Sequence, residues 1–468
     1  MIILPPNIEK LVYSVGKNAI WRCYGQEEII IDNTISADIK NKKPFIIEQN
    51  GRRILFTSNP ETIIPDDCPY AVLVKRMPTA PQFIAGDLKI IRWLKHPLIS
   101  NTLTPDDVAK TWRGSFTYIE EDRAAHLNGL RQPQAGAIHS WLATQKTRKD
   151  RAIIVMPTGT GKTETMLSIM VAGQCKKLLV TVPSDALRDQ ISEKFITLGK
   201  LHEFDIVTKE CKNPYVAVIN SGLDNVEDWR EILIRSNVIV TTMALLVKIT
   251  PEVKTLLSNT VTNVFVDEAH HVEAKTWSEF FDTFDRTKIT QFTATPFRND
   301  GKKLKGEYVY TFTLRAAQQQ GYYQKINFCP VYELEKENAD KEIAKEAVKI
   351  LHEDREVKHN NHFLMARCKD TTRAEQVYEY YREYEAYNPV VIHSRTPNKE
   401  RILDEIKNGE HQIIVCVNML GEGFDLPQLK VAAIHDEKQS LPITLQFIGR
   451  FTRTARNIGD ASFVTNTH

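Results

Sequence analysis

The chain has 468 residues, which exceeds one ordinary hydrophobic core and predicts roughly two to four domains at the usual domain size. Hydrophobic residues make up 42% and charged residues 26%, as in average globular proteins, so the composition argues against disordered, fibrous and membrane classes. The formal net charge is only +2, so any nucleic-acid site must be a local surface rather than a property of the whole molecule.

The cysteines and the start of the chain indicate the compartment. Seven cysteines are scattered along the sequence and none stands in a CxxC pair, which disfavours a zinc site and a disulfide framework. The segment from Met1 to Lys17 lacks the pattern of a secretory signal, and no apolar run reaches membrane-spanning length. We therefore expect a cytoplasmic protein without a membrane partner.

The first 115 residues read as a β-rich accessory domain. Strand-like runs separated by Asn, Gly and Pro occur at Glu28 to Asp32, Pro44 to Glu48, Arg53 to Thr57 and Ala71 to Lys75. A loose nuclease pattern is also present, with acids at Asp66 and Asp87 and a lysine at Lys89. Because both acids stand in turn-like stretches, an accessory or partner-binding module is favoured over a nuclease.

From Arg151 onward, short apolar runs alternate with helical stretches, a pattern typical of parallel sheets covered by helices on both faces. The first set of predicted strands is Ala152 to Met156, Lys177 to Val182, Val238 to Thr241, Asn263 to Val266 and Thr290 to Thr293. The second set is His362 to Ala366, Pro389 to His393, Gln412 to Val417, Val431 to His435 and Ala461 to Val464. We expect two α/β domains over residues 116–305 and 326–468, joined by a linker over 306–325.

A phosphate-binding loop is predicted where the first of these strands meets a helix, in the run Met156 to Thr163 (MPTGTGKT). Glycines let backbone amides turn toward phosphates, Lys162 can reach the β and γ phosphates, and the Thr163 hydroxyl can bind Mg²⁺. Met156 stands where the general pattern has its first glycine. The predicted nucleotide-contacting residues are Thr158, Gly159, Thr160, Gly161, Lys162, Thr163 and Glu164.

Two acids follow a second buried strand. Asp267 and Glu268 come directly after Asn263 to Val266, which predicts that both carboxylates lie at the carboxyl edge of the sheet. Asp267 is the candidate for binding Mg²⁺, and Glu268 the candidate for orienting or deprotonating the water that attacks the γ phosphate. A solvated acidic turn is the competing interpretation of this pair.

The acidic box Asp267 to His271, together with Gln291 to Arg298 (QFTATPFR), resembles the superfamily 2 helicases. The DEAH-box branch, with restriction-enzyme motor subunits and excision-repair helicases, is the most similar, and the likeness extends from about Leu130 to His468. It implies two tandem RecA-like domains that use ATP and Mg²⁺ and act on nucleic acid.

The resemblance assigns further residues in the first α/β domain. Arg131 and Gln134 resemble the element that reads adenine, and His270, Thr293 and Thr295 resemble residues that couple the acidic box to the nucleic-acid side. The implied nucleic-acid contacts are Pro183, Ser184, Thr241 and Thr242, with Ser394 and Arg395 in the second domain.

In the second domain, Gly423 and Asp425 resemble a motif that faces the nucleotide, and the run from Gln446 to Arg453 reproduces the pattern QxxGRxxR. On a helix, Gln446, Arg450 and Arg453 would share one face, because they are three or four residues apart. Guanidinium groups at the γ phosphate would stabilise the transferred phosphoryl, so hydrolysis would require closure of the two domains.

These features predict an ATP-dependent helicase or translocase, with DNA favoured by the resemblance. An RNA helicase is the nearest rival, since nothing in the sequence reveals discrimination by the 2′-hydroxyl. A nucleic-acid-activated ATPase switch that recruits a nuclease partner with little unwinding is the alternative of a different class. The likeness to restriction motors also indicates a role in bacterial genome defence, including antiviral defence, or in repair.

Overall fold

The computed structural model describes residues 2–4, 9–25, 29–31, 43–99, 103–223, 225–271, 275–297, 303–323, 325–358, 360–417, 426, 428–436, 451 and 459–467. The chain divides into two compact units, one of residues 1–130, 166–181 and 188–264 and one of residues 131–165, 182–187 and 265–468. Within the described residues, no helix combines the length and the apolar character that a membrane crossing requires.

The start of the first unit contains a small mixed sheet. Its strands lie in the order β5-β6-β7-β8, and a separate two-stranded sheet pairs β1 with β4. The bounds are β1 (Ile2–Leu4), β4 (Ile29–Ile31), β5 (Phe45–Gln49), β6 (Arg52–Thr57), β7 (Tyr70–Val74), β8 (Ile90–Lys95), α1 (Ala80–Ala85) and α2 (Pro105–Thr111). Phe45, Phe56 and Phe83 pack with centroids 5.2 to 6.0 Å apart and share one core with β1 and β4.

The nuclease pattern gains no support in this region. Asp66, Asp87 and Lys89 are all exposed. Across the described residues, no group of three His, Cys, Asp or Glu side chains is placed to hold a metal.

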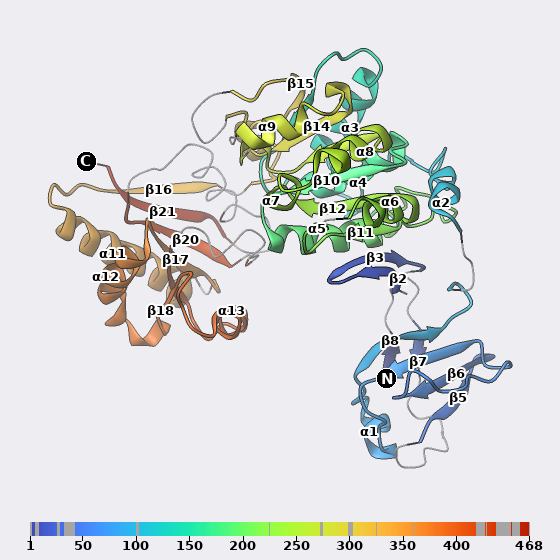
Figure 1. Ribbon diagram of the computed structural model, residues 1–468. Coiled ribbons are helices and arrows are strands. Elements are labelled where there is room, and N and C mark those ends of the chain that lie inside the picture. The colour runs from blue at the N-terminus through green and yellow to red at the C-terminus, as the bar shows by residue number, and fades with distance from the viewer. Residues whose placement is uncertain are drawn as a thin grey trace. The chain divides into compact units, whose positions relative to one another are not determined.

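The first unit also contains five neighbouring strands in the order β10-β12-β11-β3-β2. Their bounds are β10 (Leu178–Val182), β12 (Val238–Thr242), β11 (Val216–Val218), β3 (Asn18–Cys23) and β2 (Glu9–Val15). The helices are α5 (Asp185–Thr197), α6 (Val226–Arg235), α7 (Met243–Leu246) and α8 (Pro251–Thr260). The hairpin β2–β3 pairs antiparallel with β11 (Figure 1), so these early residues join α/β strands rather than the small mixed sheet.

The second unit begins with four neighbouring strands in the order β15-β9-β14-β13, where β13 starts in the first unit. The bounds are β15 (Glu307–Thr311), β9 (Ala152–Val155), β14 (Ile289–Thr293), β13 (Asn263–Val266), α3 (Gln132–Thr144), α4 (Lys162–Ala172), α9 (Lys275–Phe281) and α10 (Leu314–Gln319). Helix α4 starts in this unit and continues in the first. Every residue of β9, β14 and β13 is buried, as expected for strands covered on both faces. β15 pairs in parallel with β9, so the interval 306–325 contributes a strand and is not only a linker.

The rest of the second unit holds a six-stranded sheet in the order β16-β21-β20-β17-β19-β18, and every pairing in it is parallel. The bounds are β16 (Ile326–Val331), β21 (Ala461–Asn466), β20 (Leu429–Ile434), β17 (Phe363–Cys368), β19 (Ile413–Val417), β18 (Val390–Ile392), α11 (Lys336–His352), α12 (Thr371–Arg382) and α13 (Lys399–Lys407).

Alternation along β17 explains how both faces of this sheet are buried. Leu364 and Ala366 pack with α11 and α12, whereas Phe363 and Met365 pack with the opposite layer that includes Ile406 of α13. Figure 1 shows α11 and α12 together against one side of the sheet.

The predicted fold class is confirmed, because each strand predicted from Arg151 onward is present, the six-stranded sheet is parallel, and helices alternate with the strands along the chain. The domain ranges 1–115, 116–305, 306–325 and 326–468 remain a proposal.

Candidate functional site

The phosphate loop lies between the end of β9 and the first residue of α4, as predicted for the run Met156 to Thr163. Gly159 and Gly161 have φ of 84° and 96°, a left-handed conformation that side chains disfavour. A Cβ on Gly161 would lie 2.0 Å from Nε2 of Gln134, so glycine is also required there for space. The hydroxyl of Thr160 donates to the carbonyl of Pro157 at 2.7 Å and closes the loop on itself.

Lys162 and Glu268 form an ion pair that joins the loop to the acidic box. Their side chains are only 10% and 11% exposed, so the pair is shielded from water. Glu268 has φ of +47°, a left-handed backbone that is unusual for a side-chain-bearing residue and is typical of functional turns. The structure thus brings together the two residues that the sequence marked as phosphate ligand and water-orienting acid.

A chain of buried contacts leads from Glu268 to the next strand. Nδ1 of His270 lies 3.4 Å from Oε2 of Glu268 and 3.2 Å from the hydroxyl of Thr293. The Thr293 hydroxyl donates to the carbonyl of Thr295 at 2.8 Å, and the carbonyl of Thr293 accepts the N–H of Met156 at 2.9 Å. The predicted coupling residues are therefore in contact with one another and with the start of the phosphate loop.

Thr163 and Asp267 offer the oxygen atoms that suit Mg²⁺. Thr163 is the second residue of α4, and Asp267 follows β13 with only 7% exposure. Oδ1 of Asp267 accepts the N–H of Glu268 at 3.0 Å, which fixes the carboxylate within the acidic box. A hydroxyl and a carboxylate are hard donors of the kind Mg²⁺ takes together with phosphate oxygens, so these two residues fit that ion.

Arg131 and Gln134 hold the phosphate loop from the start of α3. Nη1 of Arg131 donates to the carbonyl of Gly159 at 2.6 Å, and Nε2 of Gln134 donates to the carbonyl of Gly161 at 3.1 Å. Oε1 of Gln134 accepts the N–H of Arg131 at 2.7 Å, which caps the helix. Both residues thus lie at the loop, and adenine recognition by them remains a proposal.

Tyr323 also contacts this loop and its neighbour Tyr322 contacts the start of α3, and the sequence analysis missed both. The Tyr323 hydroxyl donates to the carbonyl of Thr158, and the Tyr322 hydroxyl accepts the N–H of Gln132 at 3.1 Å. The guanidinium of Arg131 lies 5.7 Å from the Tyr322 ring centroid. An adjacent pair of tyrosines after a short helix was the available signal, but a local pattern could not reveal contacts across more than 150 residues.

The residues assigned to nucleic acid differ in accessibility. Pro183 and Ser184 are half-buried, and Ser394 and Arg395 are exposed. Thr241 and Thr242 are only 0% and 4% exposed, and α7 starts at the next residue. The two threonines therefore offer little side-chain surface in this structure.

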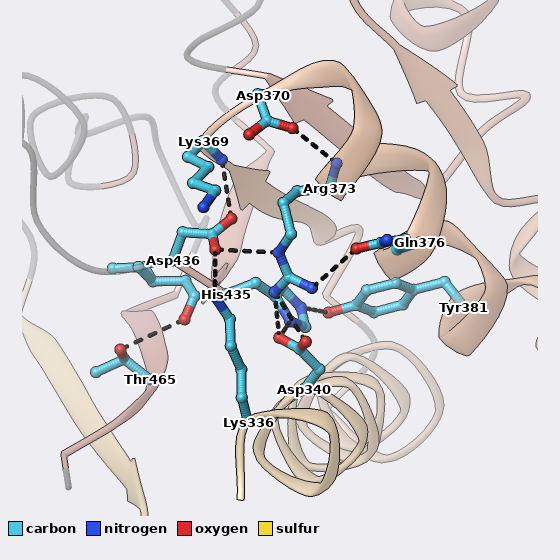
Figure 2. A network of polar contacts seen from close by, with 11 residues as sticks. Lys336, Asp340, Lys369, Asp370, Arg373, Gln376, Tyr381, His435, Asp436 and Thr465 are labelled. Atoms are coloured by element: carbon cyan, nitrogen blue, oxygen red, sulfur yellow. Dashed lines mark hydrogen bonds and ion pairs between the residues drawn. The ribbon is translucent and has the colours of Figure 1, made fainter.

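The carboxyl ends of β17 and β20 carry a buried charge network (Figure 2). Nη2 of Arg373 donates to both carboxylate oxygens of Asp340, at 2.9 and 2.8 Å, and its Nε donates to Asp436 at 3.1 Å. Nδ1 of His435 lies 3.0 Å from Asp340, and its Nε2 lies 2.9 Å from the hydroxyl of Tyr381.

These contacts shift the ionisation of the network. Burial alone would raise the pKa of Asp340, but hydrogen bonds from His435 and Arg373 outweigh it and hold that pKa below its ordinary value. Burial lowers the pKa of His435, so its neutral ring can donate to Asp340 and accept from Tyr381. Asp436 also accepts the N–H of Lys369, the residue that follows β17, at 2.9 Å.

Lys430 is a second residue that the sequence analysis missed. It lies on β20 with 0% exposure, and its ammonium donates to the carbonyl of Phe451 at 2.8 Å. Burial lowers its pKa to about 8. Phe451 belongs to the QxxGRxxR run and packs on Phe463 with centroids 5.4 Å apart, so Lys430 holds this point of the run to the sheet. A lysine inside an otherwise apolar strand was the available signal.

The residues of the second α/β domain that were predicted to face the nucleotide lie outside the described residues. They are Gly423, Asp425, Gln446, Arg450 and Arg453.

Comparisons with known proteins point to one family. Residues 128–298 match the family model for the type III restriction enzyme res subunit, and residues 342–455 match the helicase conserved C-terminal domain. The DNA 3'-5' translocase XPB2 of Sulfurisphaera tokodaii is 24% identical over 376 residues, which cover 69% of this chain and 78% of that protein.

Two solved structures show the same fold. The ATP-dependent Type ISP restriction-modification enzyme LlaBIII bound to DNA matches with a TM-score of 0.51 and 18% identity, over 72% of this chain and 27% of that chain. Mss116p bound to ssRNA and AMP-PNP matches with a TM-score of 0.50 and 15% identity, over 79% of this chain and 76% of that chain. The chain thus spans about a quarter of the restriction enzyme and most of the length of the other two relatives.

Proposed function

The chain is a superfamily 2 helicase with two RecA-like domains, related to restriction-enzyme motor subunits and repair helicases, and on that premise we propose that it is a DNA-dependent ATPase that translocates along DNA. The family relation supports the enzyme type. We choose DNA because XPB2 is a DNA translocase and the restriction enzyme LlaBIII was solved bound to DNA.

The ion pair between Lys162 and Glu268 is the observation that carries the proposal. Without a nucleotide, the lysine neutralises the acid in a shielded site. The γ phosphate of ATP offers Lys162 a stronger anionic partner, because phosphate oxygens carry more charge than one carboxylate. Glu268 is then released to orient the attacking water, so binding of substrate itself prepares the catalytic acid.

The remaining groups stabilise charge around the transferred phosphoryl. Mg²⁺ held with Thr163 and Asp267 would neutralise the phosphate oxygens when it is bound. The amino terminus of α4, which begins at Lys162, would add its positive dipole end at the same anion. Arg450 and Arg453 of the second half are proposed to complete the site, which would make hydrolysis depend on domain closure.

The contacts among His270, Thr293 and Thr295 are proposed to transmit the state of Glu268 toward the nucleic-acid surface. His270 is within 3.4 Å of the acid and 3.2 Å of Thr293, so a change at one end alters the hydrogen bonding at the other.

We place this activity in genome defence or repair, because the matched family model belongs to a restriction enzyme and XPB2 is a DNA translocase. A nuclease subunit is the partner expected in such a system. We propose a location in the reducing cytoplasm, because the seven cysteines are scattered along the sequence with no CxxC pair.

The test is ATP turnover with no polymer, single-stranded DNA, duplex DNA or RNA, run beside a strand-displacement assay. We expect stimulation by DNA. Stimulation by RNA alone would contradict the choice of DNA, and strong DNA stimulation without displacement or translocation would favour the ATPase switch.

A further inference from the structure

The hairpin β2–β3 adds two strands beside β11, and the register of these strands sets where its turn lies. Ala19 pairs with Val218 in the antiparallel pair, while Val218 pairs with Val240 in the parallel pair of β11 and β12. The turn of Gly16 and Lys17 therefore lies where β11 and β12 end. This is the carboxyl edge, where ligands of parallel sheets bind.

Buried polar contacts fix the turn in this position. Oδ1 of Asn18 accepts the N–H of Asn220 at 2.6 Å and the N–H of Ser221 at 2.9 Å, while its Nδ2 donates to the carbonyl of Ser221 at 3.2 Å. Nδ2 of Asn220 donates to the carbonyl of Lys17 at 2.8 Å. Asn18 is only 2% exposed, so the turn and the loop after β11 form one built unit.

A second anchor holds the far end of β3. Nη1 of Arg22 donates to the hydroxyl of Tyr215 at 2.9 Å, and the guanidinium lies 4.7 Å from the centroid of the Tyr215 ring. Tyr215 directly precedes β11. Because both ends of β3 are held, the turn is a rigid extension of the edge rather than a loose hairpin.

The turn and the loop after β11 both contribute exposed groups at this edge. Thr241 and Thr242 at the end of β12 are buried, whereas Gly16, Lys17, Asn220 and Gly222 are exposed. A Cβ built on Gly16 or Gly222 would meet no atom within 4 Å, so the backbone is uncrowded at these two glycines. An accessible ammonium beside an uncrowded backbone is suited to a phosphate group.

We propose that the turn Gly16–Lys17 is a phosphate-binding extension of the nucleic-acid surface, in which Lys17 contacts the sugar-phosphate backbone of the bound strand. The site rests on the proposed action on nucleic acid. Two strand spacings of about 4.8 Å separate β3 from β12, so Lys17 lengthens the track beyond β12 by roughly the rise of a few nucleotides. The contact is independent of base sequence, as a translocase requires.

Lys17→Ala tests this site, because it removes the ammonium and leaves the backbone carbonyl that Asn220 uses. Lys176→Ala is the matched control, since Lys176 is exposed and comes just before β10, at the opposite edge. The measurement is the affinity for a fluorescent oligodeoxythymidine over a range of salt concentrations, together with ATP turnover against DNA concentration.

We expect Lys17→Ala to bind roughly three- to tenfold more weakly and to lower the slope of log affinity against log salt by about 0.7 to 0.9. Turnover at saturating DNA should stay at the parent value, with half-stimulation at a correspondingly higher DNA concentration. Parent-like affinity and slope in Lys17→Ala, or an equal loss in Lys176→Ala, would overturn the site while leaving the proposed function intact. Absence of DNA binding and stimulation in the parent chain would instead overturn both.

Discussion

Buried charges occur in both predicted α/β domains, which are called the first and the second half below, but their surroundings differ. In the first half, Lys162 and Glu268 pair beside a glycine loop whose backbone is shaped for an anion. In the second half, Asp340 is held by Arg373 and His435 among well-formed helices and is only 3% exposed. Lys162 would gain a more highly charged partner when phosphate binds. Asp340, in contrast, already has its charged and hydrogen-bonding partners without a ligand. On the proposed function, the same kind of interaction serves exchange with a ligand in the first region and holds a fixed geometry in the second.

Removal of Lys162, the cation of the first pair, should have the largest effect, and this effect is on ATP turnover. Lys162→Ala deletes the proposed phosphate ligand, and we expect ATP turnover to fall by about a hundredfold to a thousandfold. Steady-state phosphate release measures the change, with Lys176→Ala as a control that should match the parent. Near-parent turnover in Lys162→Ala would mean that the pair is structural, like the one in the second half.

Removal of Arg373, the cation beside Asp340, should lower the stability of the second half. Arg373→Ala leaves the carboxylate of Asp340 buried with fewer partners, which we expect to cost about 3 to 5 kcal/mol of unfolding free energy in this half. Arg382→Ala on the same helix is the control, because its pair with Glu379 is 70% and 63% exposed and should contribute less than about 1 kcal/mol.

Native-state hydrogen exchange in peptides from α11 and α12 would resolve this difference. Equal protection in the Arg373 and Arg382 variants would show that the network contributes no more than a surface pair.

Substitution of Tyr323, which donates a hydrogen bond to the phosphate loop, should have a moderate effect on ATP binding. Tyr323→Phe removes the hydrogen bond to the carbonyl of Thr158 and keeps the ring, so about 1 kcal/mol of support is lost. We expect KM for ATP to rise roughly fivefold with little change in kcat. Tyr332→Phe is the control, because Tyr332 is 76% exposed. An unchanged KM in Tyr323→Phe would remove this residue from the nucleotide site.

Acidification should give the smallest of the changes that we predict for the second half. The pKa values of Asp340 and His435 are both lowered by the fold, so the unfolded chain binds more protons. Stability is therefore full near neutral pH and declines below about pH 6.5, continuing as pH falls through the carboxyl range. Between pH 7 and pH 5 we expect a loss on the order of 1 kcal/mol. Hydrogen exchange in α11 and α12 that is insensitive to pH, after correction for the intrinsic rate, would contradict this.

The sequence was sufficient for features that are local. A buried strand followed by MPTGTGKT predicts a phosphate loop, because the turn and the start of the helix depend on neighbouring residues. The acidic box after Asn263 to Val266 was predicted on the same ground. Helix and strand periodicities likewise gave the parallel sheets.

The sequence did not reveal pairings between distant segments. Asn18 meets Ser221 across 203 positions, and Tyr323 meets Thr158 across 165. The runs EKLVYSV and NAIWRC flank the turn Gly16–Lys17 and could have predicted a hairpin, but nothing local indicates that β11 is its neighbour. Lys430 shows the same limit, since its partner is a backbone carbonyl of a later segment.

Glu268→Gln tests the central claim most directly, because it keeps the size and shape of the side chain and removes its charge and basicity. The measurement pairs DNA-stimulated ATP turnover with equilibrium binding of a fluorescent ATP analogue. We predict that turnover falls by at least about a hundredfold while nucleotide binding is retained or tightened, since Lys162 no longer has a charged competitor for the phosphate. Parent-level turnover in Glu268→Gln would contradict the assignment of this acid and with it the proposed site of hydrolysis.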